Sequence, residues 1–121
     1  MTGDPLSNVV DQPLSVDISV LQRLRAFRDR PKVSYLPGVD PALERERLAR
    51  VLDALADTLI EGIESHPTKL WVMAQFQQSL AQVEQEDTEA REHFGTEVEG
   101  IMDILGIESS DGLLARYLGG I

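Results

Sequence analysis

The sequence predicts an all-α fold, a single-domain bundle of three longer helices and two short ones that run mostly antiparallel. Three stretches of the 121-residue chain repeat apolar residues at steps of three or four, which places these residues on one face of a helix. Residues that begin or stop helices flank these stretches. Residues 31–39 are interpreted as an extended crossing, and because a single strand there would have no partner, no sheet is expected.

The first residues of the chain differ from the rest. Residues 1–15 hold Pro5 and Pro13 among polar residues, which predicts a flexible or extended N-terminal arm, and residues 16–121 are expected to form one helical domain. No signal peptide is expected, and the apolar runs fall far short of the roughly 20 residues that span a bilayer. The lack of cysteine fits a reducing cytosol, so we expect a cytoplasmic protein.

A short helix is predicted directly after the arm. Asp17 can accept hydrogen bonds from the first free N–H groups of this helix, and Pro31 stops it. Its inner face consists of apolar residues at helical spacing: Val20, Leu21, Leu24 and Phe27. Pro37 and Gly38 then predict a turn in the extended crossing.

The second helix has the strongest pattern. Asp40 is a good N-cap, Pro41 suits the first helical position, and the helix is expected to end near Ser65, ahead of Pro67. Its core-facing stripe steps by three or four: Leu48, Leu52, Leu55, Leu59 and Ile63.

The third helix is predicted to begin near Pro67 or Thr68 and to fade into a polar turn at residues 84–87. We expect five residues on its buried stripe: Leu70, Met73, Phe76, Leu80 and Val83. Trp71 falls beside this stripe.

The fourth helix can be capped by Asp87 or Thr88, and Gly106 is well placed to end it. Its stripe consists of apolar residues: Phe94, Val98, Ile101, Met102 and Leu105. Residues 109–111 offer capping side chains for a last short helix with these apolar members: Leu113, Leu114, Tyr117 and Leu118.

The formal charge of -10 is unevenly distributed. Residues 1–50 hold eight Lys or Arg against seven Asp or Glu, a net +1, whereas residues 51–121 hold three against fourteen, a net -11. Nucleic acid and anionic membranes require a concentrated basic patch, and the one basic stretch, Arg23 to Lys32, is interrupted by Asp29. Neither is therefore expected as a partner.

The negative charge is densest at residues 84–99. This segment has a single Arg91 against these acids: Glu84, Glu86, Asp87, Glu89, Glu92, Glu97 and Glu99. They form either a solubilising surface or a docking surface for a basic protein partner. Trp71 and Tyr35 are candidate aromatic anchors for such a partner, although Trp71 can equally wedge under a loop. A homodimer formed through leftover helix stripes is the alternative.

Enzymatic and metal chemistry have weaker support. Glu89, His93 and Glu97 share one helical face and could form a metal site or a solvated face, and no second such motif accompanies them. His66 suits a capping or surface role at a helix junction. Ser109 and Ser110 lack a nearby histidine, so they are interpreted as capping residues. No phosphate-binding or dinucleotide motif occurs, and no catalytic residue, cofactor or metal is predicted.

The C-terminal segment Ile101 to Leu114 (IMDILGIESSDGLL), with Tyr117-Leu118-Gly119, resembles the signature of a small bacterial helical domain family of unknown function. This resemblance implies a bacterial origin and a compact helical fold, and it implies no activity. In size and acidity the chain also looks like toxin-neutralising immunity proteins.

Overall fold

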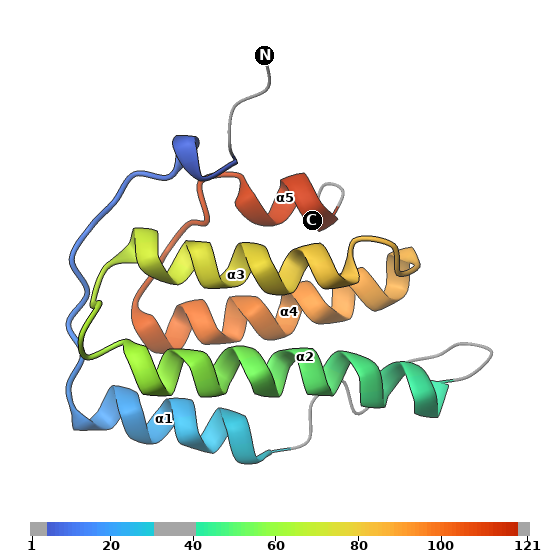
Figure 1. Cartoon of the computed structure of the whole chain (residues 1–121), viewed down its shortest axis with the longest axis horizontal. Helices are drawn as coiled ribbons and strands as arrows, with labels where there is room; N and C mark the ends of the chain where they lie inside the picture. Colours follow the sequence, from blue (N-terminus) through green and yellow to red (C-terminus); the bar gives the residue numbers. More distant parts are fainter. Residues whose placement is uncertain (1–4, 31–40, 119–121) are drawn as a thin grey trace.

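A computed structural model of the chain describes residues 5–30 and 41–118 (Figure 1). These residues form one 3₁₀ turn and five α-helices: η1 (Pro5–Asn8), α1 (Ile18–Asp29), α2 (Pro41–Gly62), α3 (Lys69–Val83), α4 (Thr88–Leu105) and α5 (Leu113–Leu118). Within the two described ranges there is no strand, only an isolated bridge between Pro13 and Thr68. The all-α prediction is confirmed. The predicted turn at 37–38, the Asp40 cap and Tyr35 lie outside the described residues.

Side-chain caps begin three of the helices where the sequence predicts them. The Asp17 carboxylate accepts from the Val20 N–H at 3.1 Å, and the Thr68 and Asp87 side chains do the same for α3 and α4. Gly106 ends α4 in the left-handed region, at φ +74°, where a side chain would be strained. The second helix ends at Gly62, one turn earlier than predicted, because the chain bends there and the N–H groups of residues 65 and 66 both turn back to the Gly62 carbonyl.

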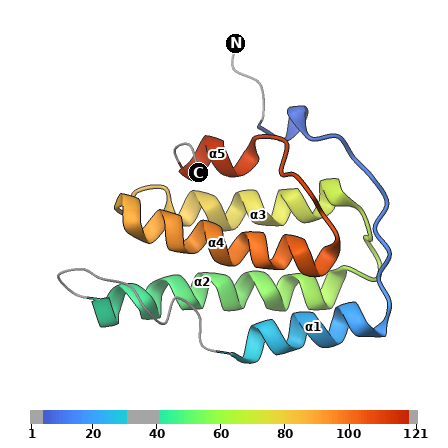
Figure 2. The same cartoon turned by 180° about the vertical axis from the view of Figure 1, so that it is seen from behind.

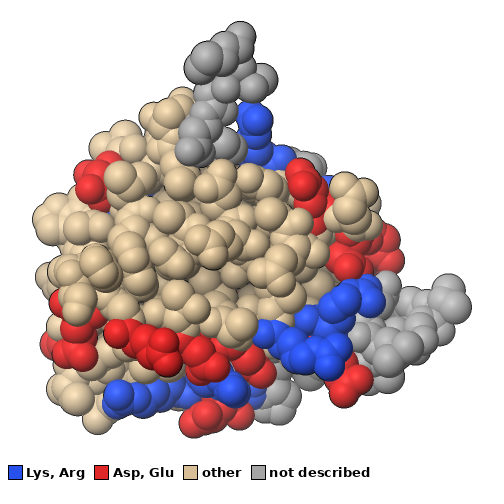
Figure 3. Space-filling model, viewed as in Figure 1, with Lys and Arg blue, Asp and Glu red and all other residues tan. Residues whose placement is uncertain are grey.

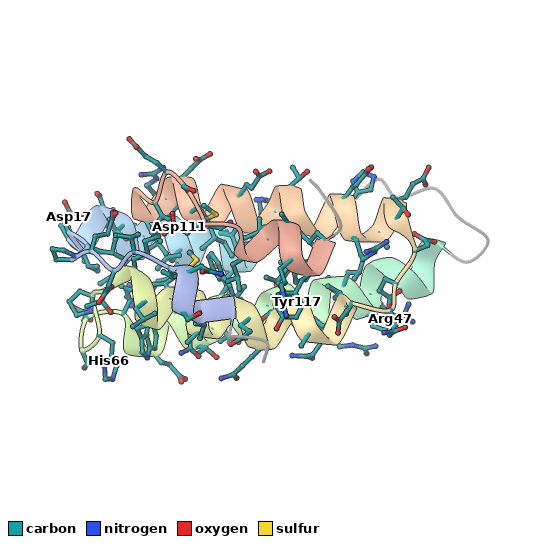
Figure 4. The ribbon with its side chains drawn as sticks, turned by 90° about the horizontal axis from the view of Figure 1, so that it is seen from above. Asp17, Arg47, His66, Asp111 and Tyr117 are labelled. Carbon is teal, nitrogen blue, oxygen red and sulfur yellow. The ribbon has the colours of Figure 1, made fainter. Side chains whose placement is uncertain are left out.

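Consecutive helices run antiparallel, as Figures 1 and 2 show from opposite sides. Helix α2 contacts α1, α3 and α4, helix α4 contacts α1, α2 and α5, and α5 also packs on α3. Seen from above, α3 and α2 lie on one side of the molecule and α4 and α1 on the other (Figure 4). No helix among the described residues is both long and apolar enough to cross a bilayer.

The core fills the space between these helices. Its largest fully buried side chains come from every helix: Leu24, Leu48, Leu52, Leu59, Ile63, Met73, Phe76, Leu80, Phe94, Ile101, Leu113 and Leu118. The prediction for Leu70 was wrong, since this side chain is 40% exposed while Val72 is fully buried. Helix α3 packs against α2 on one side and against α5 and η1 on another, so its buried arc turns toward Val72 and leaves Leu70 outside.

The segment before α1 is held against the start of α3. The Leu14 N–H donates to the Pro67 carbonyl at 2.8 Å, and the Lys69 N–H donates to the Gln12 carbonyl at 2.9 Å. Asp11 accepts from the Leu70 N–H at 2.9 Å, and the Leu14 side chain is buried. These contacts fix residues 11–14 in extended form along the bundle.

A buried ion pair joins the start of α3 to the loop before α5. The Lys69 ammonium, on a side chain only 5% exposed, lies 2.7 Å from Asp111 Oδ2. The same oxygen accepts from the Val10 N–H at 2.8 Å. Because Lys69 and the Val10 N–H both favour the charged carboxylate, the pKa of Asp111 lies below its ordinary value near 3.8. Asp111, just ahead of α5, thus joins the start of α3 to the segment that follows η1 (Figure 4).

Candidate functional site

Four acids of α4 share one outward line on the helix. Glu89, Glu92, Glu99 and Asp103, with Thr96 between them, follow one another at steps of three and four and are all exposed. We call these four acids the acidic row, which extends over about 21 Å at 1.5 Å per residue. Within the described part of the chain no ion pair involves any of the four. Like charges at this spacing destabilise a helix, so the row costs α4 stability.

Two of the predicted docking acids instead join helices within the bundle. Glu86 pairs with Arg47 through both carboxylate oxygens, at 2.6 and 3.0 Å, and Glu97 pairs with Arg30 at 2.6 and 3.3 Å. The carboxylates of Glu86 and Glu97 are mostly covered, with 16% and 14% of the side chain exposed. Such bidentate pairs fix the relative position of the two side chains. Arg47 lies at the opposite end of the molecule from Asp17 and His66 (Figure 4).

Asp87 and Glu84 lie in the turn between α3 and α4. The Asp87 carboxylate accepts from the Ala90 N–H at 2.9 Å, so it caps α4 and stabilises its first turn. Glu84 is exposed at the end of α3. The predicted acidic surface therefore divides into ion-paired, capping and exposed members.

A groove between α1 and α4 lies next to the acidic row. Its first part, of about 280 Å³, is lined by these residues: Arg23, Ala26, Phe27, Arg30, Gly100 and Ile104. A second part, of about 380 Å³, continues along residues 12–15 and includes Asp103 of the row. Arg23 and Ile104 line both parts, so the two hollows adjoin. We call them together the α1–α4 groove.

Gly100 and Arg30 shape this groove. A Cβ added at Gly100 would meet nothing within 4 Å, so the missing side chain leaves open space above the helix. The Arg30 guanidinium lies 4.8 Å from the centre of the Phe27 ring and is held there by Glu97. The α1–α4 groove thus has an apolar floor, a positive bank on α1 and the acidic row along α4.

Trp71 has a packing role at the junction of α2 and α3. Its ring stacks on the His66 ring, with centroids 5.3 Å apart and planes 17° from parallel. A Cβ on Gly62 would lie 2.6 Å from the Trp71 ring, so the indole rests directly on the α2 backbone. Trp71 is half-buried and lies on a different helix from the acidic row, and the structure does not bring the two together.

His93 is half-buried on α4 between Glu89 and Glu97 in sequence. The described ranges contain no cluster of three His, Asp or Glu side chains with metal-binding geometry. Glu97 faces Arg30.

The groove was not foreseen from the sequence, although one signal for it was present. Gly100 lies inside a helix, where glycine is unfavourable by about 1 kcal/mol relative to alanine. A glycine that the backbone does not require points to space that must stay open. Which helix faces that space depends on tertiary packing, so the role of Arg23 and Phe27 could not be predicted.

Comparison with protein-family models matches residues 15–121 to the family described as "Domain of unknown function (DUF4844)". Comparison with curated proteins and with solved structures found no match.

Proposed function

The chain belongs to the DUF4844 family, a domain of unknown function, and from the surface of α4 we propose that it is a non-enzymatic protein-binding module. In this proposal the acidic row docks a basic segment of a partner protein, and the α1–α4 groove receives an apolar side chain of the same segment. The observation that carries the proposal is the position of the open space at Gly100 directly beside the acids Glu99 and Asp103.

The surface defines the chemistry of the partner. Acids at steps of three and four suit Lys or Arg residues presented along one face of a helix or extended segment. The volume over Phe27 and Ile104 suits an aliphatic or aromatic anchor, the kind of residue that dominates binding energy at interfaces. Arg23 on the α1 side of the groove repels basic residues. The basic residues of the bound segment should therefore face α4, which sets how the segment is oriented in the groove.

The sharpest form of the proposal is a bacterial, cytoplasmic immunity or antitoxin protein. Its support is the small size and the charge of -10, which suit a protein that neutralises a basic toxin. A gene for a protein with a basic domain beside the gene for this chain would support this form, and its product would be the first partner to test.

The experiment has two stages. Two variants each carry one photoreactive residue. In the first it replaces Thr96, which lies within the acidic row, and in the second, the control, it replaces Ala115, which is exposed on α5. Cross-linking in the native host is expected to capture a partner at Thr96 and not at Ala115. The purified partner is then titrated against the wild type and against the double variant Glu92→Lys/Glu99→Lys. We expect affinity to fall at least about tenfold, since charge complementarity is reversed at two places.

A matched control reverses the same number of charges on a different element, away from α4. Glu61 near the end of α2 and Glu64 just after it are both exposed, and Glu61→Lys/Glu64→Lys changes the net charge by the same amount as the double variant in the row. Binding that weakens equally in both double variants reflects net charge alone and refutes the proposed surface. Gly100→Leu fills the groove and should weaken binding without altering charge, and a helical circular dichroism spectrum confirms folding.

A further inference from the structure

Helix α3 differs from the other long helices in the chemistry of its outer surface. Its one charged residue is Lys69, which is buried against Asp111. The exposed and half-exposed side chains of α3 are all uncharged: Leu70, Trp71, Ala74, Gln75, Gln77, Gln78, Ala81 and Gln82. Figure 3 shows a broad area without charge over α3, bordered by charged residues. In a chain with 26% charged residues this surface is exceptional.

The outermost line of α3 combines small side chains with amides. Ala74, Gln78 and Ala81 follow at steps of four and three, so Gln78 stands between two alanines. Alanine permits close approach of a neighbouring helix. Beside this line lies a groove of about 200 Å³ between α2 and α3, lined by Ala54, Leu55, Thr58, Gln75, Gln78, Ser79 and Gln82, again without charge.

The amides on this surface are arranged to complement themselves. The side-chain N–H groups of Gln75 and Gln82 donate to the carbonyls of Trp71 and Gln78, so their side-chain oxygens remain as acceptors. No hydrogen bond of the Gln78 amide occurs within the described residues, which leaves its N–H groups as donors. A donor with acceptors about one turn away on either side matches a second copy of itself related by a two-fold axis.

We propose that the uncharged face of α3 binds a second copy of this chain, with α3 antiparallel to its counterpart and Gln78 beside the two-fold axis. Each copy carries a charge of -10, so two copies repel each other overall, and a contact surface without charge adds no further repulsion at the interface. A charged partner gains no ion pairs from a neutral surface, whereas a second copy meets self-complementary amides. A helix of 15 residues is about 22 Å long, which gives a small interface and a weak, reversible dimer.

This dimer is independent of the proposed docking function, because α3 and α4, the helix that carries the acidic row, lie on opposite sides of the molecule (Figure 4). The two also respond oppositely to salt. Screening weakens attraction between the acidic row and a basic partner, but it reduces repulsion between two copies of a chain of charge -10.

Sedimentation equilibrium of the wild type tests the proposal in about 50 mM and about 500 mM NaCl, between which the Debye length falls from roughly 14 to 4 Å. We expect a monomer–dimer equilibrium that strengthens with salt. Gln78→Lys should weaken the dimer at least about tenfold, because two like charges then meet at the axis. Gln22→Lys, at an exposed glutamine of α1, makes the same change in net charge and should leave the equilibrium unchanged.

Mixing provides the second arm. An equimolar mixture of Gln78→Lys and Gln78→Glu chains should associate more strongly than either variant alone. Residue 78 meets its own copy in the proposed dimer, so the mixture brings a lysine against a glutamate. A wild type that stays monomeric at about 1 mM in high salt overturns the proposal, because that concentration exceeds the range of weak specific interfaces. It is also overturned if Gln78→Lys dimerises as well as Gln22→Lys, or if the mixture shows no gain.

Discussion

At the scale of single residues, two helical glycines should respond oppositely to the same substitution. Gly62→Ala places a Cβ 2.6 Å from the Trp71 ring and should lower the free energy of unfolding by about 1–3 kcal/mol. Gly100→Ala meets nothing within 4 Å and should raise it by up to about 1 kcal/mol, since alanine favours the helix. Urea denaturation measures both.

The Trp71 contact can be tested further with a double variant. If the clash is the cause, the double variant Gly62→Ala/Trp71→Leu should lose less free energy of unfolding than the two single variants lose in sum. Additive effects would mean that the indole does not rest on Gly62 in solution.

The buried pair of Lys69 and Asp111 predicts a pH dependence. Because the pKa of Asp111 is lowered in the folded chain, its ion pair stabilises the fold above the unfolded pKa near 3.8 and loses this effect as pH falls through the folded pKa. Asp111→Asn should therefore be least stable relative to wild type near neutral pH, with a melting point several degrees lower. The difference should shrink below about pH 4. Asp103→Asn, on the exposed acidic row, is the control; a pH-independent difference for Asp111→Asn would contradict the assignment.

At the scale of elements, Asp87 was predicted as a docking acid, and its effect on stability tests whether it has a structural role instead. Its carboxylate caps α4, so Asp87→Ala should cost about 1 kcal/mol of unfolding free energy. Glu84→Ala, three residues earlier, removes a carboxylate that has no hydrogen bond or ion pair among the described residues, so it should leave stability nearly unchanged. Thermal denaturation of the two variants distinguishes them, and equal stabilities would exclude the cap.

Helix starts were predictable because they depend on local chemistry. Asp17, Thr68 and Asp87 cap their helices through side chains that reach only three residues ahead. Leu70 was misassigned because burial on α3 depends on where α5 and η1 pack, which a periodic pattern on one helix does not contain.

The candidate surface was predictable only in part, for the same reason. Charge density marked residues 84–99, but the division between exposed Glu92 and ion-paired Glu86 and Glu97 depends on arginines 39 and 67 residues away in the chain. Such pairs form only when the helices pack together, so the spacing of residues within one segment does not predict them.

At the scale of the whole molecule, 21 acids against 11 basic residues create self-repulsion. We expect the melting point at pH 7 to rise by a few degrees when NaCl increases from about 10 to about 300 mM, because the Debye length falls from roughly 30 to 6 Å. Differential scanning calorimetry in dilute solution measures this, with a dimer-disrupting Gln78→Lys chain as control for association. A melting point that falls with salt would show that ion pairs such as Arg47–Glu86 outweigh the repulsion.

The hydrogen bond from the Val10 N–H to Asp111 joins residues that are 101 positions apart in the sequence. This separation bears on the order in which parts of the chain fold. Closing so long a loop costs more chain entropy than pairing neighbouring helices, so this contact should form after the bundle and open before it. Amide hydrogen exchange should then be faster at Leu14 and Lys69, whose N–H groups bond across this junction, than at the centre of α2. Partial opening would expose the Lys69 ammonium to water while the four long helices stay folded. We therefore expect the N-terminal segment to be the last part of the fold to pack and the first to detach.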